Sequence, residues 1–596
     1  MEEHEKGREG FESDEAYKLH SLRHSTAHIM AEAISTVFPG ARFAIGPAIK
    51  DGFYYDVEVS RPIHEDDLGA IELAMKEIVK RNSRFERREL SRDEALALFG
   101  QLDQRFKLEL IAGLPEGEAI TVYDQGGFVD LCRGPHAPRT GNCKHFKLLK
   151  VSGAYWRGDA TGPQLQRVYG TVWPTREALD AHLFRLEEAK KRDHRRLGVE
   201  LDLFMFHEYA PGSPFFLPKG EVLYHELSEA MRGLLLGEGY VAVRTPQLFD
   251  ARLWQTSGHW EHYRENMFRF EEHEDKPKED EQQEGRFFSL KPMNCPSHML
   301  VFGSKRRSYR ELPMRIHDQG VLHRNEVRGA LGGLTRVRQF CQDDAHLFVT
   351  EDQIQAEVAD LLALVKRVYG AFGLGVEVKL STRPEQKLGD DALWDAAEGA
   401  LAAAMEANGM AYTVNAGDGA FYGPKIDFDL VDALDRRWQT ATIQLDYQLP
   451  RRFNLSYVGA DNQEHTPVVI HRAIFGSLER FIAILVEHYA GAFPTWLSPE
   501  QARVLTVSEK SEEHGGAVLS ALKAAGLRAT LDARSDKIGF KIREAHNQHV
   551  PYIAVIGEKE AANGTVALRR AGVEQPEVMA LADFVARVRA DAARPF

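Results

Sequence analysis

Residues 323–326 read His-Arg-Asn-Glu and residues 476–481 read Gly-Ser-Leu-Glu-Arg-Phe, and these two stretches decide the fold of the chain. Each sets an arginine close to a glutamate. An arginine considered by itself usually lies on the surface of a protein. Fixed guanidinium groups stabilise charge that builds up on phosphate oxygens. Whether Arg324 and Arg480 have this role depends on the family that the two stretches resemble.

Three further residues lie in settings that a catalytic zinc ion needs. They are Cys295 in Lys-Pro-Met-Asn-Cys-Pro, His346 in Asp-Asp-Ala-His and His471 in Val-Ile-His-Arg. Three protein ligands leave coordination positions open for a substrate, whereas four ligands close a structural zinc site. The spacing is too irregular to be a zinc signature by itself, so the prediction of one Zn²⁺ per chain rests on local context.

The two arginine stretches resemble motifs 2 and 3 of the class II aminoacyl-tRNA synthetases. Together with the zinc set, the chain resembles the threonyl-tRNA synthetases over nearly its whole length. The resemblance implies an enzyme that activates threonine with ATP and Mg²⁺ and transfers it to tRNA(Thr). Pro246, in Arg-Thr-Pro, resembles the proline of motif 1, which forms the dimer interface in this class, so a homodimer is implied.

The resemblance also assigns roles around ATP and threonine. Arg324 would hold the α-phosphate and the carboxylate region, and Arg336 and Arg480 would hold the outer phosphates, although Arg338 could replace Arg336. Glu326 would read the adenine amino group. The other residues assigned to this pocket, by stacking or by lining it, are Phe340, Gln342, Tyr422, Gln439 and Gln444. His323 departs from the family pattern, where an aromatic residue is expected.

A zinc ion would explain how threonine is told from valine. The two amino acids are nearly isosteric, and an apolar pocket separates such pairs by only about a hundredfold. A Lewis acid that binds the amino and hydroxyl groups together would lose a ligand when valine enters. Asp344 lies two residues before His346, so it shares a face with that histidine if the segment is a strand, and it could accept a hydrogen bond from the hydroxyl. The alternative for Asp344 is a structural salt bridge.

His259, in Thr-Ser-Gly-His-Trp, matches a histidine implicated in transfer of the amino acid to tRNA. A near-neutral pKa would suit a general base for the terminal ribose hydroxyl. The alternative is a histidine packed against Trp260.

A second cluster lies near the start of the chain. His24 and His28 have the spacing that puts two imidazoles on one helix face, and Cys132 and His136 repeat it. Spacing alone reads as a four-ligand zinc site. The resemblance instead implies the editing domain shared by threonyl- and alanyl-tRNA synthetases, thought to work without metal in the threonyl enzymes. The remaining residues that match its pocket are Tyr55, Lys107 and Asp130.

Editing answers a physical need, because serine keeps both groups that would bind the zinc and is smaller only by a methyl group. A missing methyl costs only about 1–3 kcal/mol. Serine is therefore expected to pass activation and to be hydrolysed from the tRNA afterwards. The alternative is a set of core histidines in an inert domain.

The gross composition is ordinary for a soluble globular protein, and we expect a cytoplasmic one because the start of the chain does not resemble a signal peptide. Apolar residues make up 43%, no apolar run is long enough to cross a membrane, and four cysteines do not make a disulfide framework. The polar N-terminus lacks signal-peptide features. A net charge of −14 argues against nucleic-acid binding, but phosphates are bound by local basic patches.

The pattern along the chain predicts multidomain α+β and α/β architecture. We expect a disordered start over 1–15, an editing domain over 16–174 and a linker helix over 175–200. A class II catalytic domain with an antiparallel sheet follows over 201–498, interrupted by a charged loop over 271–285, and an α/β anticodon-binding domain over 499–596. No ubiquitin-like domain is expected ahead of His24.

Four side chains in the last domain are anticodon candidates: Arg534, Lys537, Glu560 and Arg569. Ser535 follows Arg534 where asparagine is expected. Two alternatives remain for the whole chain. One is a prolyl- or seryl-tRNA synthetase. The other is a synthetase-like RNA-binding regulator without activity, which should have lost phosphate-binding arginines or a metal ligand.

Overall fold

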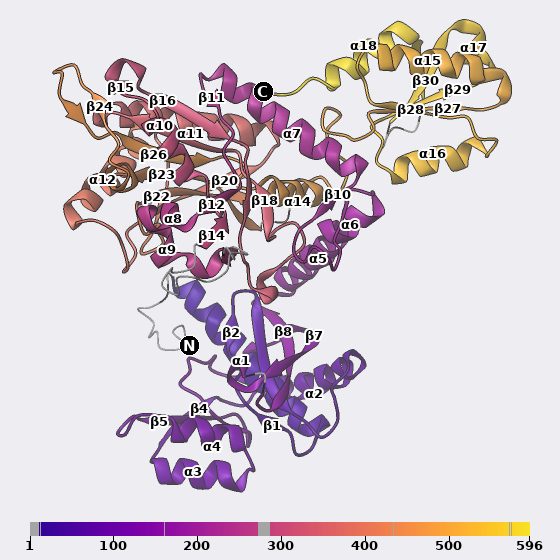
Figure 1. The fold of residues 1–596 in the computed structure, drawn as a ribbon. Helices are drawn as coiled ribbons and strands as arrows, with labels where there is room; N and C mark the ends of the chain where they lie inside the picture. The colour runs from indigo at the N-terminus through magenta and orange to yellow at the C-terminus, as the bar shows by residue number, and fades with distance from the viewer. Residues whose placement is uncertain are drawn as a thin grey trace, which may run out of the picture. The chain divides into compact units, whose positions relative to one another are not determined.

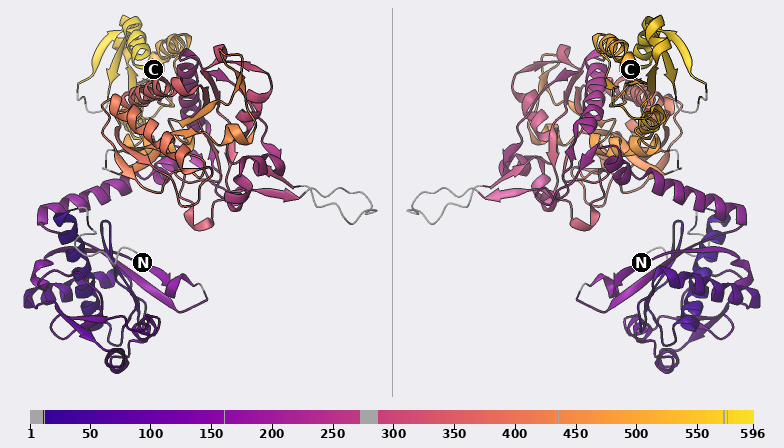
Figure 2. Two further views of the ribbon diagram at one scale, coloured as in Figure 1. Left: turned by 90° about the vertical axis from the view of Figure 1, so that its left-hand side faces the viewer. Right: turned by 90° about the vertical axis from the view of Figure 1, so that its right-hand side faces the viewer.

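The computed structural model, drawn as a ribbon in Figure 1, describes residues 11–596 except 12, 160, 272–286, 433, 435, 571–572 and 574. The chain forms two compact units, Met1–Glu187 and Glu188–Phe596, and Figure 2 shows them from two sides. Most of the predicted disordered start and of the charged loop lies outside the described residues. No helix in the described ranges is long and apolar enough to span a membrane.

The first unit is built on a five-stranded sheet of order β1-β3-β8-β7, with β2 paired to β3. Its strands are β1 (Arg42–Phe43), β2 (Ala48–Ile49), β3 (Gly52–Glu58), β7 (His145–Tyr155) and β8 (Gln164–Trp173). Helix α1 (Asp14–Val37) contacts α2 (Leu68–Arg81), β3 and β8. Ser13 caps α1, because its hydroxyl accepts a hydrogen bond from the Ala16 amide.

Helix α1 is buried on nearly every side from Ser21 to Ile34, which is typical of a helix inside a core rather than on a surface. Its two histidines are therefore held away from bulk water. A second, three-stranded sheet of order β4-β5-β6 belongs to the same unit. The elements of this part are β4 (Glu86–Leu90), α3 (Arg92–Gln101), α4 (Arg105–Ala112), β5 (Ile120–Asp124) and β6 (Val129–Leu131).

The second unit contains an eight-stranded sheet of order β11-β16-β19-β26-β23-β22-β20-β21. Its strands are β11 (Val241–Ala242), β16 (Met314–Asp318), β19 (Asp344–Val349), β20 (Gly375–Ser381), β21 (Thr413–Asn415), β22 (Lys425–Val431), β23 (Arg437–Asp446) and β26 (Val468–Ala473). The six central strands pair antiparallel, and only the two edge strands pair parallel. This confirms the predicted antiparallel core.

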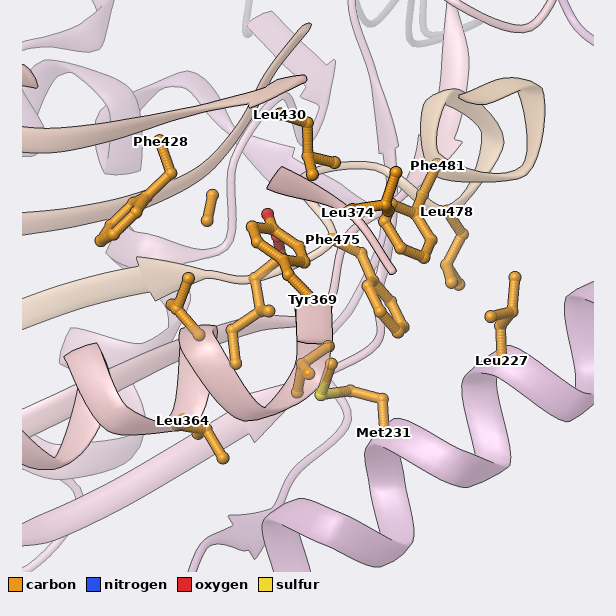
Figure 3. Packing of buried hydrophobic residues seen from close by; sticks show 14 of the residues in the cluster. Leu227, Met231, Leu364, Tyr369, Leu374, Phe428, Leu430, Phe475, Leu478 and Phe481 are labelled. Carbon is orange, nitrogen blue, oxygen red and sulfur yellow. The ribbon is translucent and has the colours of Figure 1, made fainter. Parts of the chain in front are cut away.

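Helices cover this sheet and close a large apolar core. They are α7 (Pro218–Gly237), α11 (Ile354–Ala371), α12 (Asp391–Ala407) and α14 (Leu478–His488). Figure 3 shows Met231 of α7 and Tyr369 of α11 beside the phenyl groups of Phe475 and Phe481. This packing fixes α14, the helix that carries Arg480, against the sheet.

Shorter elements complete this part of the chain. They are β9 (Phe204–Met205), β10 (Phe215–Phe216), β12 (Leu248–Asp250), α8 (Ala251–Ser257), α9 (His259–His262), β13 (Arg269–Glu271), β14 (Phe287–Leu290), α10 (Cys295–Gly303), β15 (Arg307–Ser308), β17 (Val321–His323), β18 (Gln339–Cys341), α13 (Leu449–Arg452), β24 (Tyr457–Val458) and β25 (Glu464–His465). Strands β17 and β18 form an antiparallel hairpin that carries Arg324 just beyond its first strand.

The last part of the chain has a five-stranded sheet of order β28-β27-β29-β30-β31. Its elements are β27 (Ala502–Thr506), α15 (Glu512–Ala524), β28 (Ala529–Asp532), α16 (Ile538–Asn547), β29 (Tyr552–Ile556), α17 (Glu558–Asn563), β30 (Thr565–Arg569), β31 (Glu577–Ala580) and α18 (Leu581–Asp591). Strands β28, β27 and β29 pair in parallel, as alternating strands and helices predict.

The prediction of a single linker helix is wrong. The segment forms α5 (Arg176–Arg192) and α6 (His194–Glu200), separated at Asp193. The Asp193 carboxylate accepts a hydrogen bond from the Arg195 amide at 2.8 Å and so caps α6. An aspartate that caps a new helix ends the preceding one. The prediction rested on the helical spacing of Leu179, Leu183 and Leu186, which does not extend to Asp193.

Candidate active sites

The three predicted zinc ligands meet on the central sheet. His346 of β19 and His471 of β26 are direct neighbours across an antiparallel pair, and Cys295 begins helix α10. Their ligand atoms lie within 4.8 Å of one another, and all three side chains are buried. Burial lowers the pKa of His346 well below its ordinary value and raises that of Cys295 well above it. One thiol and two imidazoles are donors that zinc prefers.

Two neighbouring side chains orient these imidazoles. The Nε2 atom of His471 lies 2.8 Å from the Asp446 carboxylate, which leaves Nδ1 as the nitrogen that can bind a metal. The Nδ1 atom of His346 lies 2.8 Å from Nδ1 of His298, which leaves Nε2. Metal-binding histidines characteristically have such second partners. Sequence reasoning missed Asp446 and His298, because only strand pairing and helix docking bring them to the site.

Further predicted side chains lie around the three zinc ligands. Asp344 lies on β19, as expected, and its carboxylate accepts a hydrogen bond from the Asn294 amide at 3.1 Å. Burial raises the pKa of Asp344. The Tyr422 ring lies 5.3 Å from that of His471, and Gln444 is the register partner of His471 on β23. The structure thus brings these predicted residues together around the trio.

A cavity of about 200 Å³ holds the predicted ATP residues. Its lining includes seven of them: Arg324, Glu326, Arg336, Phe340, Gln342, Gln439 and Arg480. The guanidinium of Arg324 lies 5.0 Å from the centre of the Phe340 ring. Burial, with the nearby positive charges of Arg336 and Arg324, lowers the pKa of Arg480. Three cations facing one cavity favour a polyanionic ligand.

The cavity lining distinguishes the two arginines considered for the outer phosphates. Arg338 donates to the Glu326 carbonyl at 3.1 and 2.9 Å and is not among the residues that line the cavity. Arg336 lies 4.0 Å from the Glu326 carboxylate and lines the cavity. Arg480 donates to the carbonyls of Thr335 and Gln439 at 2.9 and 3.0 Å. The geometry therefore favours Arg336 over Arg338.

His259 is buried at the start of α9. Its Nδ1 lies 2.7 Å from the Ser257 hydroxyl and its Nε2 lies 3.1 Å from the Met293 sulfur. The ring contacts Trp254 and Phe421, whereas the sequence suggested Trp260 as the packing partner. Burial lowers the pKa of His259 to about 3, so the imidazole is neutral at pH 7.

The N-terminal quartet comes together inside the first unit. The Cys132 sulfur lies 3.3 Å from Nε2 of His24 and 3.2 Å from Nε2 of His136. The ring of His28 lies 4.4 Å from that of His136, and all four ligand atoms fall within 4.8 Å of one another. Burial lowers the pKa of His28 to about 4 and raises that of Cys132 to about 12. Ser25, which the sequence did not single out, lies 3.0 Å from His136 Nδ1.

A buried charged network borders the quartet. The Lys107 ammonium lies 2.7 Å from the Asp130 carboxylate and donates to the Tyr55 hydroxyl at 2.9 Å. Tyr55 in turn donates to Asp130. His28 Nε2 lies 3.6 Å from the same carboxylate. Because an unpaired buried charge is costly, this closed network fixes the position of each group beside the quartet.

The anticodon candidates do not form one cluster of available side chains. Arg534 pairs with the carboxylates of Asp532, Asp536 and Glu544. Glu560 accepts a hydrogen bond from the Gly557 amide at 2.9 Å and caps α17. The other two candidates, Lys537 and Arg569, lie at the N-cap of α16 and at the end of β30.

Three family models match the chain. Residues 268–489 match the tRNA synthetase class II core domain (G, H, P, S and T), and residues 501–591 match an anticodon binding domain. Residues 120–169 match the second additional domain of threonyl and alanyl tRNA synthetases. The antiparallel sheet with its arginine-lined cavity is that of a class II aminoacyl-tRNA synthetase.

Curated relatives narrow this class. A threonine–tRNA ligase of Anaeromyxobacter dehalogenans strain 2CP-1 is 54% identical over 583 residues, which covers 97% of this chain and 89% of the relative. Threonine–tRNA ligase 2 of Bacillus subtilis strain 168 is 51% identical over 559 residues, covering 94% and 86%. The chain belongs to the threonine–tRNA ligase family.

A solved structure is similar as well. The RNA binding domain of threonyl-tRNA synthetase from Cryptosporidium parvum Iowa II aligns with a TM-score of 0.63 and 44% identity, covering 67% of this chain and 98% of that one. The threonyl resemblance, the fold class and the prediction of an enzyme are thus confirmed, and the relatives do not favour the prolyl or seryl alternative.

Proposed function

We propose that this enzyme joins threonine to tRNA(Thr) through a threonyl-adenylate, rejects valine with a zinc ion and hydrolyses mischarged seryl-tRNA at a second site. The observation that carries the proposal is the buried trio Cys295, His346 and His471 beside the arginine-lined cavity. The domain roles follow the predicted boundaries, with editing over 16–174, a linker over 175–200, activation over 201–498 and anticodon binding over 499–596.

In activation, the protein holds ATP by charge. Arg324 is assigned to the α-phosphate and the threonine carboxylate, and Arg336 and Arg480 to the outer phosphates. Their mutual repulsion is relieved when a polyanion enters, so binding ATP stabilises the cavity. Phe340 offers a face for the adenine ring. The neighbouring cavity residues assigned to substrate contact are Glu326, Gln342 and Gln439.

For amino-acid selection, Cys295, His346 and His471 would hold the zinc. When bound, zinc supplies a Lewis acid with open positions for the amino and hydroxyl groups of threonine. Asp344 would accept a hydrogen bond from that hydroxyl, and Tyr422 and Gln444 would line the pocket. Valine lacks the hydroxyl and leaves a polar position unfilled, which is costlier than a difference in methyl groups.

His259 is assigned to transfer of threonine to the tRNA. Burial lowers its pKa to about 3, far below the near-neutral value that suits a general base, so binding of the tRNA must raise this pKa before His259 can take a proton from the ribose hydroxyl. The Nδ1 atom of His259 is held by Ser257. Its Nε2 faces the Met293 sulfur, so a ribose hydroxyl must replace that contact for His259 to act as a base.

The editing site is assigned to the N-terminal quartet and its charged network. The imidazoles of His28 and His136, whose pKa values burial lowers, can bind and activate water, and Lys107 and Asp130 can position the aminoacyl ester. The residues assigned to this site are His24, His28, Tyr55, Lys107, Asp130, Cys132 and His136. A homodimer through the segment around Pro246 completes the proposal, and Arg534, Lys537, Glu560 and Arg569 remain the anticodon candidates.

Two assays test the proposal. Elemental analysis of purified protein should give one zinc per chain, and Cys295→Ser should lose it together with calorimetric binding of threonine. Separately, seryl-tRNA(Thr) should be deacylated much faster than threonyl-tRNA(Thr), and His136→Ala should abolish that difference. Zinc that survives Cys295→Ser would refute the zinc assignment, and equal hydrolysis of both esters would refute editing.

A further inference from the structure

His194, the first residue of helix α6, ties three segments together. Its backbone amide donates to the Glu487 carboxylate at 3.0 Å, and its Nδ1 lies 2.6 Å from the same oxygen. On the other side of the ring, Nε2 accepts a hydrogen bond from the Leu334 amide at 3.1 Å. The side chain is buried. These partners fix the tautomer of the ring, with the proton on Nδ1 and the lone pair on Nε2.

The glycine before Leu334 is shaped to this contact. Gly333 has a φ of +56°, and a Cβ built there would lie 2.2 Å from Nε2 of His194. Any side chain at this position would therefore push the loop away from the imidazole. The close approach of backbone to histidine requires glycine.

The loop that His194 holds is part of the ATP cavity. Thr335 follows Leu334, and its carbonyl accepts a hydrogen bond from Arg480 at 2.9 Å. Arg336 comes next and lines the cavity. Glu487 lies on α14, the helix that also carries Arg480. His194 thus joins the loop of one phosphate-binding arginine to the helix of the other.

We propose that His194 is a positioning residue for ATP binding. It holds the 332–336 loop against α14 and so fixes the separation of the Arg336 and Arg480 guanidinium groups. This inference rests on the proposed role of the two arginines in binding phosphates. Asp193, His194 and Glu487 also satisfy the spacing of a metal site. Both ring nitrogens are already engaged in hydrogen bonds, however, so the cluster acts as a structural link.

Two substitutions separate the two sides of the ring. In His194→Asn, the side-chain amide can still donate to Glu487, but no acceptor reaches the Leu334 amide. In His194→Gln, the longer side chain can place its oxygen near the position of Nε2. We expect His194→Asn to raise the KM for ATP about five- to tenfold in pyrophosphate exchange, the effect of one lost buried hydrogen bond. His194→Gln should have a KM for ATP close to that of the wild type. The KM for threonine should change less than twofold in both variants.

The controls distinguish loop positioning from general stability. His514 donates to the Thr565 carbonyl at 3.0 Å in the C-terminal part of the chain, so His514→Asn removes a comparable contact. That variant should keep the wild-type KM for ATP. Gly333→Ala should reproduce the ATP defect, and its combination with His194→Asn should add little, because both release the same contact.

An unchanged KM for ATP in His194→Asn or in Gly333→Ala would overturn the inference. So would equal losses for ATP and threonine that His194→Gln does not rescue, since those indicate only weakened folding. Failure of the underlying proposal has a different signature. In that case Arg480→Ala would leave the KM for ATP at its wild-type value, whatever the His194 variants do.

Discussion

Asp446→Asn should weaken zinc binding without disturbing the fold around it. Asp446 is fully buried, and its Oδ2 lies 2.8 Å from His471 Nε2. Its Oδ1 accepts the amides of Gln448 and Leu449 at 2.7 and 3.0 Å. Asparagine keeps an oxygen for these two amides. Its NH₂ group then faces Nε2 as a donor, which requires the imidazole proton to move to Nδ1.

The proton on Nδ1 would occupy the nitrogen that must bind the metal. The substitution also removes the negative charge that strengthens the imidazole as a ligand. Loss of such an outer partner lowers metal affinity about 10- to 100-fold, or about 1.4–2.7 kcal/mol. Competition with a chromophoric chelator measures the zinc Kd directly, and threonine-dependent exchange in zinc buffers should recover as free zinc rises.

A matched control is available elsewhere in the second unit. Asp461 lies 2.9 Å from Nε2 of His465 in an exposed pair, so Asp461→Asn removes a carboxylate–histidine contact away from the trio. It should leave the zinc Kd unchanged. Wild-type zinc affinity in Asp446→Asn, or an equal loss in Asp461→Asn, would refute the assignment of His471 as an oriented ligand.

Three further outcomes are expected. Arg480→Ala should lower pyrophosphate exchange about 100-fold because ATP is held less well, while threonine binding measured by calorimetry persists. A variant that loses threonine binding but keeps ATP binding would contradict the role of Arg480. Tyr55→Phe deletes a hydroxyl bonded to Asp130 and Lys107, so seryl-tRNA deacylation should fall and the first unit should lose about 1–3 kcal/mol in denaturant melts. An unchanged melt would contradict the network. The pKa of His28 is about 4 when folded and 6.5 when unfolded, so the unfolded state binds more protons between these values. Stability should therefore fall by about 3 kcal/mol as pH drops from 6.5 toward 4. Melts of His28→Gln should lose that part of the pH dependence. A pH dependence identical to that of the wild type would refute the contribution of His28.

Local sequence patterns were sufficient for much of the architecture. Alternating strands and helices correctly indicated that strands β28, β27 and β29 of the C-terminal part pair in parallel. Candidates such as Arg324 and Cys295 could be found because the residues next to them in the sequence form recognisable motifs. The break at Asp193 was missed, since Leu179, Leu183 and Leu186 all precede it and the capping carboxylate of Asp193 decides where the helix ends.

The rest of the site depends on contacts between distant segments. Asp446 and His298 stand in no motif, and they reach the histidine ligands only through strand pairing and helix packing. Glu487 is 293 residues from its partner His194, so no local pattern connects them. Such residues become visible only when the fold brings a buried polar group to its partner, because nearly every buried polar group needs one.

Amino-acid-dependent pyrophosphate exchange tests the central claim most directly, with threonine, serine, valine and proline compared on zinc-replete enzyme. The account predicts strong exchange with threonine, measurable exchange with serine, and almost none with valine or proline. Exchange with valine close to that with threonine would contradict selection by a zinc ion held by Cys295, His346 and His471.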